Sequence, residues 1–261
     1  MNTPRRTGDA TTEETGFWGA GRPLGVAHRG ASKHAPENTL AAFRLALDLG
    51  ARALECDARR TRDGAIVTIH DQRVDRTTDG QGPVETLTLA ELRRLDAGRW
   101  FGPQFAGERI PLLEEVLQLA RDRAVVELEI KNDPLPYEGI ERQIIDLVDR
   151  AGMERDVLAM SFDHRCVRTI HALAPRLQTG IIYAARLADA PAAARAAGAD
   201  ALCPDWRYVS QSDVDEAHAA GLRVSVWTVD EEAALRRCLA LGVDGVTSND
   251  TRLLMRVLEG R

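Results

Sequence analysis

The stretch Val26-Ala27-His28-Arg29-Gly30, followed closely by Pro36-Glu37-Asn38-Thr39, sets the pattern for the whole chain. The first five residues are typical of the end of a short apolar strand, and the last four of a helix start with Asn38 as its N-cap. The loop between them carries a histidine, an arginine and a glycine. A cation and an acid/base group at the carboxyl end of a strand indicate a site for an anionic ligand, and Gly30 lets the backbone turn beneath it.

The same order of strand, loop and helix repeats along the chain from Leu24 to Leu258. Short apolar runs alternate with helical patterns, and counting the strand before each major helix gives about eight units. That is the number of units that a closed (β/α)8 barrel, or TIM barrel, needs. We therefore predict an α/β fold in which residues 22–261 form a single TIM-barrel domain, preceded by a flexible N-terminal extension over residues 1–21.

Residues 71–111 interrupt this alternation after the second strand. They are rich in Asp, Thr, Gly and Arg, with one short helical pattern at Leu89–Leu95. A segment of this length over one end of a barrel is more often a functional insertion than a structureless loop.

A doubly wound open sheet is the alternative fold, because it also alternates strands and helices. Such sheets bind their ligands at one switch point, and many carry Gly-x-Gly-x-x-Gly after the first strand. This chain has no such motif there, and its charged residues lie at the ends of many strands. The barrel is therefore favoured.

The composition limits the classes of function. The chain has 261 residues, 44% of them hydrophobic, and a net charge of -6. An acidic chain with no basic run is a poor nucleic-acid binder. The four cysteines form no Cys-x-x-Cys pair, and no apolar run approaches the roughly 18–20 residues of a membrane span. Because the N-terminus is polar and lacks an apolar leader, we expect a cytoplasmic protein without stable membrane insertion.

Two carboxylates, Glu55 and Asp57, lie two positions apart on the second predicted strand. Alternation along a strand places both side chains on one face and Cys56 on the other. Two acids side by side at a strand end repel each other unless a cation lies between them. A hard divalent ion with oxygen ligands is therefore expected here.

A later strand repeats this geometry with Glu127, Glu129 and Lys131. All three fall on one face, which points inward in a barrel. Glu129 lies near the carboxyl end and can complete the carboxylate cluster. Lys131 lies one step further out, where its ammonium can hold a phosphate or a leaving oxygen.

Two histidines, His28 and His70, end strand-like segments. Two imidazoles near a metal ion and cations suit in-line phosphoryl transfer, in which one takes a proton and the other gives one. The remaining histidines lie in loops or helical patterns, where a structural role is expected; they are His34, His164, His171 and His218.

Taken together, these residues resemble the signature of the glycerophosphodiester phosphodiesterase family. The resemblance runs from about residue 24 to 255, in order and at plausible spacing. The matching motifs are His28-Arg29-Gly30, Pro36-Glu37-Asn38-Thr39, Glu55-x-Asp57, His70-Asp71, Arg76-Thr77-Thr78-x-Gly80-x-Gly82, Leu95-Asp96-Ala97-Gly98-x-Trp100, Ile110-Pro111-x-Leu113-Glu114-Glu115, Glu129-x-Lys131, Val226-Trp227-Thr228-Val229 and Gly242-Val243-Asp244-Gly245.

The resemblance implies a TIM barrel with a small insertion after the second strand. It also implies a metal-dependent hydrolase that splits small glycerophosphodiesters into sn-glycerol 3-phosphate and an alcohol. The resemblance implies that Glu55, Asp57 and Glu129 bind one divalent ion, magnesium or calcium. It implies that His28 and His70 are the general acid and base. It also implies that Arg29 and Lys131 bind the phosphate and that Trp227 packs against the glycerol.

The chain departs from the family pattern in two places. Family members often have Thr-Asp-x-Pro after the last Gly-Val-Asp-Gly motif, whereas this chain has Thr247-Ser248-Asn249-Asp250. Glu127 stands where a neutral polar residue is common. It is either a group that supports the metal ligands or a buried acid with a raised pKa.

Two alternative functions remain to be compared. A barrel phosphodiesterase acting on lysophospholipids or phosphoinositides shares the paired histidines, but it needs a wide apolar mouth or an interfacial apolar stretch. Neither is evident in the sequence, which favours small, soluble diesters. A non-catalytic phosphodiester-binding protein on the same barrel could have lost an acid/base group. Both histidines, the three carboxylates and the cations are present, which favours the enzyme.

Overall fold

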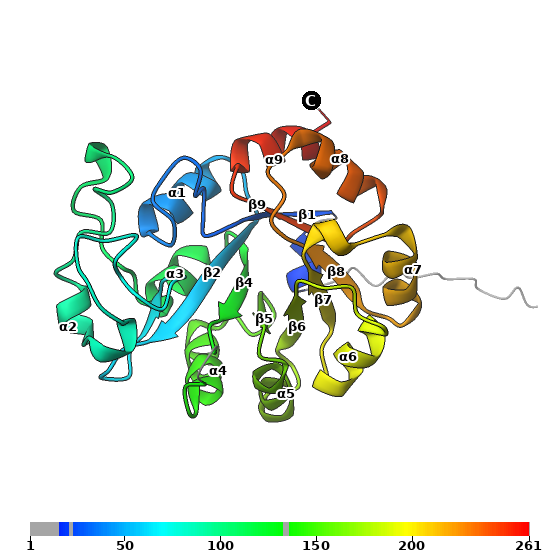
Figure 1. Ribbon diagram of the computed structural model, residues 1–261, viewed down its shortest axis with the longest axis horizontal. Helices are drawn as coiled ribbons and strands as arrows, with labels where there is room; N and C mark the ends of the chain where they lie inside the picture. The colour runs from blue at the N-terminus through cyan, green and yellow to red at the C-terminus, as the bar shows by residue number, and fades with distance from the viewer. Residues whose placement is uncertain (1–15, 21–22, 133–135, 261) are drawn as a thin grey trace, which may run out of the picture.

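The computed structural model describes residues 16–20, 23–132 and 136–260 and has a closed parallel barrel at its centre (Figure 1). The barrel strands are β1 (Leu24–Ala27), β2 (Ala53–Arg60), β4 (Val125–Ile130), β5 (Val157–Ser161), β6 (Gln178–Tyr183), β7 (Ala201–Pro204), β8 (Arg223–Val226) and β9 (Gly245–Ser248). They pair in the order β1-β9-β8-β7-β6-β5-β4-β2, and β1 also pairs with β2, which closes the ring. The predicted TIM barrel is confirmed.

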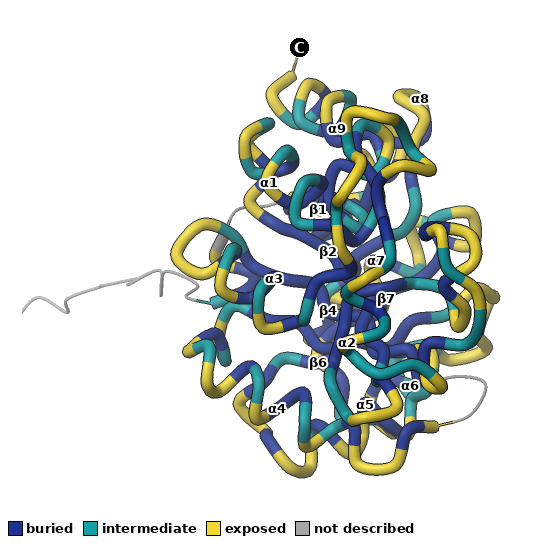
Figure 2. The backbone as a smooth tube through the Cα atoms, turned by 90° about the vertical axis from the view of Figure 1, so that its left-hand side faces the viewer, coloured by how far each residue is buried: buried dark blue, intermediate teal, exposed yellow. Residues whose placement is uncertain are grey.

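A helix follows each barrel strand and covers the outside of the sheet, so that the strands are buried and the outer helix faces are exposed (Figure 2). The helices are α1 (Leu40–Asp48), α3 (Leu113–Ala120), α4 (Ile140–Ala151), α5 (His164–Leu173), α6 (Ala190–Ala197), α7 (Gln211–Ala219), α8 (Glu232–Ala240) and α9 (Thr251–Leu258). Side-chain caps fix several of their starts; Asp250, for example, accepts a hydrogen bond from the backbone N–H of Leu253 in α9. Among the described residues, no helix is long and apolar enough to cross a membrane.

Alternation along β2 and β4 separates an apolar outer layer from an acidic inner face, as predicted. Cys56 packs in the apolar layer between strands and helices. The parallel register aligns Glu55 with Glu127 and Asp57 with Glu129, so that four acids share the inner face of two adjacent strands. All four are buried. The sheet pairing thus brings carboxylates together from positions more than seventy residues apart.

The N-terminal segment differs from the expected flexible extension where the structure describes it. Phe17–Ala20 forms a short 3-10 helix, η1, and both Phe17 and Trp18 are buried. They pack in the cluster that contains Leu24 and Val125, which lie at the starts of β1 and β4. The two aromatic rings therefore fill the amino end of the barrel. The rest of the predicted extension lies outside the described residues.

The insertion lies beside the barrel, near α1 and α3, and begins earlier than predicted (Figure 1). Its elements are β3 (Ile66–Thr68), η2 (Val84–Thr86), α2 (Leu89–Leu92) and η3 (Pro103–Phe105). β3 runs antiparallel to the end of β2, so the chain reverses around Gly64, whose φ is +88°. The end of β2 and β3 therefore form a hairpin, β3 lies outside the barrel, and the insertion has its own small apolar core.

Candidate active site

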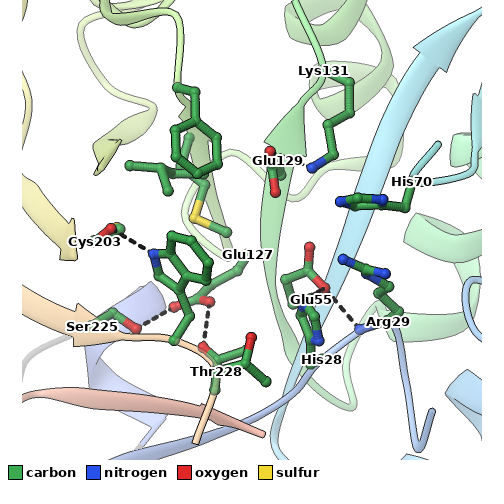
Figure 3. A pocket seen from close by; sticks show the side chains of 15 residues that line it. His28, Arg29, Glu55, His70, Glu127, Glu129, Lys131, Cys203, Ser225 and Thr228 are labelled. Carbon is green, nitrogen blue, oxygen red and sulfur yellow. Dashed lines mark hydrogen bonds and ion pairs between the residues drawn. The ribbon is translucent and has the colours of Figure 1, made fainter. Parts of the chain in front are cut away.

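One cavity of about 240 Å³ opens at the carboxyl ends of the barrel strands. Seven of the eight predicted site residues line it, and the eighth, Asp57, lies buried among them. The complete lining is His28, Arg29, Glu55, His70, Glu127, Glu129, Lys131, Met160, Phe162, Ile182, Cys203, Ser225, Trp227, Thr228 and Thr247. Figure 3 shows Arg29, Glu129 and Lys131 on one side of the cavity and Cys203 and Ser225 on the other.

Three carboxylates, Glu55, Asp57 and Glu129, form a compact buried cluster. One oxygen of each lies within 4.8 Å of the other two. Glu55 Oε1 is buried and has no hydrogen-bond partner among the described residues. An unpartnered buried oxygen beside two further carboxylates fits the hard oxygen ligands that Mg²⁺ and Ca²⁺ take.

The pKa values of Glu55 and Glu129 are raised, whereas the pKa of Asp57 is lowered. Burial, reinforced by the charge of Asp57, raises the pKa of Glu55 well above its ordinary value and that of Glu129 to about 7. Burial opposes the ionisation of Asp57 too, but nearby cations hold its pKa below the ordinary range. A divalent ion would favour the charged form of all three, because it stabilises anionic ligands.

The two predicted phosphate-binding cations lie against this cluster. Lys131 Nζ is 2.5 Å from Glu129 Oε1 and 3.1 Å from Asp57 Oδ1. Arg29 Nε is 3.2 Å from Asp57 Oδ2, and the Arg29 backbone N–H donates to Glu55 at 2.7 Å. Both side chains also line the cavity. An anion in the cavity would thus meet two cations that are already held by carboxylates.

Each of the two predicted acid/base histidines is held at its Nδ1 atom. His28 Nδ1 lies 2.6 Å from Asn249 Oδ1, and His70 Nδ1 lies 2.7 Å from Asp71 Oδ1. These bonds leave Nε2 of each ring for proton transfer. Burial, and then the charge of Arg29, lowers the pKa of His28 to about 4; burial also lowers the pKa of His70.

The structure adds Asn249 to the predicted residues. It belongs to the segment that departs from the family pattern, immediately after β9, and it reaches His28 because β9 pairs with β1. Its amide nitrogen donates to Asp230 Oδ2 at 2.6 Å, which fixes the orientation of the amide. The only sequence signal was its place after a barrel strand.

Asn38 has a different role from the predicted one. The N-cap of α1 is Thr39, whose side chain accepts a hydrogen bond from the backbone N–H of Ala42. Asn38 has a φ of +57°, and its side chain donates to Asp57 Oδ2 at 2.7 Å and accepts from the Asp57 backbone at 3.2 Å. It therefore orients a carboxylate of the cluster.

Gly30 is required for packing against α1. Its φ is +79°, and an added Cβ would lie 2.6 Å from the backbone carbon of Ala42. The close approach of this loop to the helix, rather than the space beneath a ligand, explains the glycine.

Glu127 lies on the cavity floor, where the sequence left two roles open. Its oxygens accept hydrogen bonds from Ser225 Oγ at 2.6 Å and Thr247 Oγ1 at 3.1 Å. Burial raises its pKa to about 6. It is thus a buried acid with a raised pKa, and its contacts tie β4 to β8 and β9.

The far wall of the cavity is apolar and includes Met160, Phe162 and Trp227. The Trp227 ring meets the ring of Phe162 edge to face at 5.6 Å, and its Nε1–H donates to the Cys203 carbonyl at 2.8 Å. The cavity is therefore two-sided, with charges on one side and a fixed aromatic surface on the other.

The four histidines that were expected to be structural are absent from the cavity lining. His218 Nε2, for example, lies 2.7 Å from Asp244 Oδ2, and His164 Nε2 lies 3.0 Å from the Ile182 carbonyl oxygen. These contacts agree with structural roles.

A parallel barrel with clustered acids, paired imidazoles and cations at its carboxyl end has the features of an enzyme that acts on phosphate esters. Residues 28–253 match the glycerophosphoryl diester phosphodiesterase family. The chain belongs to this family and is an enzyme of that class.

Curated relatives agree with this assignment. The chain is 40% identical over 238 residues to a glycerophosphodiester phosphodiesterase of Caldanaerobacter subterraneus subsp. tengcongensis, covering 91% of this chain and 98% of the relative. It is 34% identical over 257 residues to a glycerophosphodiester phosphodiesterase of Bacillus subtilis, covering 92% of this chain and 87% of the relative.

Solved structures show the same fold. An Oleispira antarctica phosphodiesterase in complex with the product sn-glycerol-3-phosphate superposes with a TM-score of 0.83 at 30% identity, covering 91% of this chain and 97% of that one. A glycerophosphodiester phosphodiesterase from Agrobacterium tumefaciens has a TM-score of 0.78 at 32% identity, covering 88% and 98%.

Proposed function

We propose that this protein is a metal-dependent phosphodiesterase that hydrolyses glycerophosphodiesters to sn-glycerol 3-phosphate and an alcohol. One observation carries the proposal. A single cavity brings together three clustered carboxylates, two imidazoles and two cations, in a chain of the glycerophosphoryl diester phosphodiesterase family. The product named in the Oleispira antarctica structure is the phosphate ester expected from this reaction.

The carboxylate cluster would hold one divalent ion, Mg²⁺ or Ca²⁺, on Glu55, Asp57 and Glu129. The support is the orphaned Glu55 Oε1 and an excess of negative charge, since three carboxylates meet two cations. When bound, such an ion polarises a phosphoryl oxygen and lowers the pKa of a hydroxyl or water. Asn38 keeps the Asp57 carboxylate oriented toward this role.

The two histidines would move the protons. One ring takes a proton from the attacking water or from the substrate's own glycerol hydroxyl, and the other protonates the departing alcohol. Their Nδ1 bonds to Asn249 and Asp71 hold both rings in place during the transfer. Because the pKa of each ring is lowered, both rings are neutral near neutral pH, the form in which an imidazole can accept a proton.

The cations and Trp227 would hold the substrate at its two ends. Arg29 and Lys131 stabilise the negative charge on the phosphoryl oxygens. The opposite wall, with Trp227 and Phe162, offers an apolar surface for the carbon backbone of the glycerol. The two-sided cavity thus matches a molecule with a charged and an uncharged end.

Hydrolysis of glycerophosphocholine, followed by product identification, tests this function. The wild-type chain should release sn-glycerol 3-phosphate with Mg²⁺ or Ca²⁺ present and lose the activity in EDTA. His28→Ala and His70→Ala should each lose most turnover while melting at the wild-type temperature. Full activity in excess EDTA would remove the metal from the proposal, and an unaffected rate in either variant would remove that histidine.

A second candidate is a diester with a large apolar alcohol, such as a lysophospholipid. Phe162, Leu187 and Tyr208 are exposed and lie in segments that follow β5, β6 and β7. Of the three, Phe162 lines the active-site cavity and offers it an exposed apolar side chain. However, a cavity of about 240 Å³ is small, so an acyl chain would have to lie outside it. Rates with glycerophosphocholine and lysophosphatidylcholine at equal concentration separate the two candidates.

We also infer that residues 22–261 act as one catalytic domain in the cytoplasm. All eight barrel strands between residues 24 and 248 contribute to one closed sheet. The four cysteines are buried free thiols, as expected in a reducing compartment. Fractionation of the producing cells would test this location.

A further inference from the structure

The Arg76 guanidinium, from the insertion, binds two carboxylates at once. Its Nε and Nη2 atoms donate to Asp71 Oδ2 and Oδ1 at 2.6 and 2.9 Å. Its Nη1 and Nη2 atoms donate to Glu37 Oε2 and Oε1 at 2.7 and 2.8 Å. The roles proposed above give Arg76 no part in the reaction, yet four of its hydrogen bonds are directed toward the site.

Each of these carboxylates holds one residue of the candidate active site. Asp71 Oδ1 binds His70 Nδ1 at 2.7 Å. Glu37 Oε1 accepts from Arg29 Nη1 at 2.9 Å. A continuous series of charged contacts therefore runs from a proposed acid/base group, through Arg76, to a proposed phosphate-binding group.

The fork shape of the arginine matters for this arrangement. A guanidinium presents several N–H donors in one plane and can bind two carboxylates side-on, whereas an ammonium is a single point charge. Without it, Glu37 and Asp71 would face each other as like charges, and the Glu37 side chain exposes only 13% of its surface to water. Arg76 therefore fixes both the charge and the geometry of this pair.

The backbone around Arg76 is itself ordered by hydrogen bonds. Thr78 Oγ1 donates to the Val74 carbonyl at 2.8 Å and accepts from the Gly80 N–H at 3.0 Å. Thr77 and Thr78 are both buried. The turn is thus a fixed support from which the arginine reaches the barrel.

We propose that Arg76 is a positioning residue that orients His70 through Asp71 and Arg29 through Glu37 at the same time. The inference rests on the proposed function, because it concerns the groups that would move a proton and bind the phosphate. It also gives the insertion a role in the reaction: it completes the site from outside the barrel.

Arg76→Lys tests the proposal, because it keeps the charge and removes the fork. We expect kcat/KM for glycerophosphocholine to fall about 10- to 100-fold, the usual cost of losing a partner that orients a site residue. Arg73→Lys is the matched control. Arg73 lies in the same insertion, its side chain is 55% exposed, and it forms an ion pair with Asp75. The kcat/KM of this variant should therefore stay within about 2-fold of wild type.

Two further variants separate the effect of Arg76 on His70 through Asp71 from its effect on Arg29 through Glu37. Asp71→Asn should mainly lower kcat, because it disturbs the histidine. Glu37→Gln should mainly raise KM, because it disturbs the arginine that meets the phosphate. Arg76→Lys should show both changes. Adding Arg76→Lys to the Asp71→Asn/Glu37→Gln double variant should cost little more, because the contacts are already lost.

Binding of sn-glycerol 3-phosphate, measured by calorimetry, gives a readout that needs no turnover. Arg76→Lys and Glu37→Gln should weaken it by a similar factor of about 10, while Asp71→Asn and Arg73→Lys should leave it near wild type. Binding without hydrolysis by the wild type would reject the proposed function and still test Arg76. Wild-type kinetics and affinity in a folded Arg76→Lys variant would overturn the inference, as would equal losses in Arg73→Lys.

Discussion

His28 Nδ1 lies 2.6 Å from Asn249 Oδ1, although the two residues are 221 positions apart. The amide nitrogen of Asn249 is used by Asp230, so its oxygen must face the ring. An amide oxygen can only accept, which places the ring proton on Nδ1 and leaves Nε2 as the unprotonated atom of the neutral ring. Nε2 lies 3.9 Å from Glu55 Oε2, beside the proposed metal site.

Asn249→Ala should therefore lower kcat about 10- to 100-fold, because the ring loses the bond that fixes its tautomer and direction. Steady-state kinetics and a thermal melt measure the effect and verify the fold. Ser32→Ala is the matched control, since Ser32 Oγ donates to the same amide oxygen at 2.9 Å. Equal rates in both variants would show that the amide does not act through His28.

Much of the fold and site could be predicted because it depends on short-range rules. Alternation along a strand assigns Glu55 and Glu129 to the inner face, and the carboxyl ends of barrel strands gather at one rim. These rules require no knowledge of which strands pair. The eight strand and helix units follow from the same local patterns.

The rest depends on contacts between distant segments or on turn chemistry. Asn249 reaches His28 only because β9 closes the barrel on β1. Phe17 fills the barrel although it stands in a polar stretch. The antiparallel β3 follows Asp63-Gly64, a tight-turn signal between two strand-like runs that the prediction overlooked.

Metal binding should stabilise the fold through Glu55. A ligand that binds only the folded chain adds about 2.7 kcal/mol at a concentration of one hundred times Kd, so saturating Mg²⁺ or Ca²⁺ should raise the melting temperature above that in EDTA. Glu55→Gln should lose most of this shift. Glu85→Gln, at an exposed acid of the insertion, should keep it. A full shift in Glu55→Gln would place the ion elsewhere.

Phe17 should be required for stability, because it closes the amino end of the barrel. The residue is completely buried, and truncation of a buried aromatic ring costs about 3–5 kcal/mol. Phe17→Ala should lower the free energy of unfolding by this amount in urea titration, with little change in KM. Trp100→Ala removes an aromatic ring that is 41% exposed and should cost far less. Similar losses in both variants would argue against a structural role of η1.

Glu127→Gln should change how stability depends on pH. Burial raises the pKa of Glu127 from 4.5 to about 6, so the folded chain holds this proton more tightly than the unfolded chain does. Its contribution to stability is complete below about pH 4.5 and is lost as pH rises through about 6. The loss of stability amounts to roughly 2 kcal/mol, and it cannot occur in a variant that has glutamine here.

Urea unfolding in EDTA at pH 4.5 and 7.5 measures the effect. At the higher pH, the free energy of unfolding of Glu127→Gln should gain about this much relative to wild type. Other titrating groups, including His28, are present in both proteins and cancel in the difference. A constant difference between the two proteins at both pH values would mean that folding does not raise the pKa of Glu127.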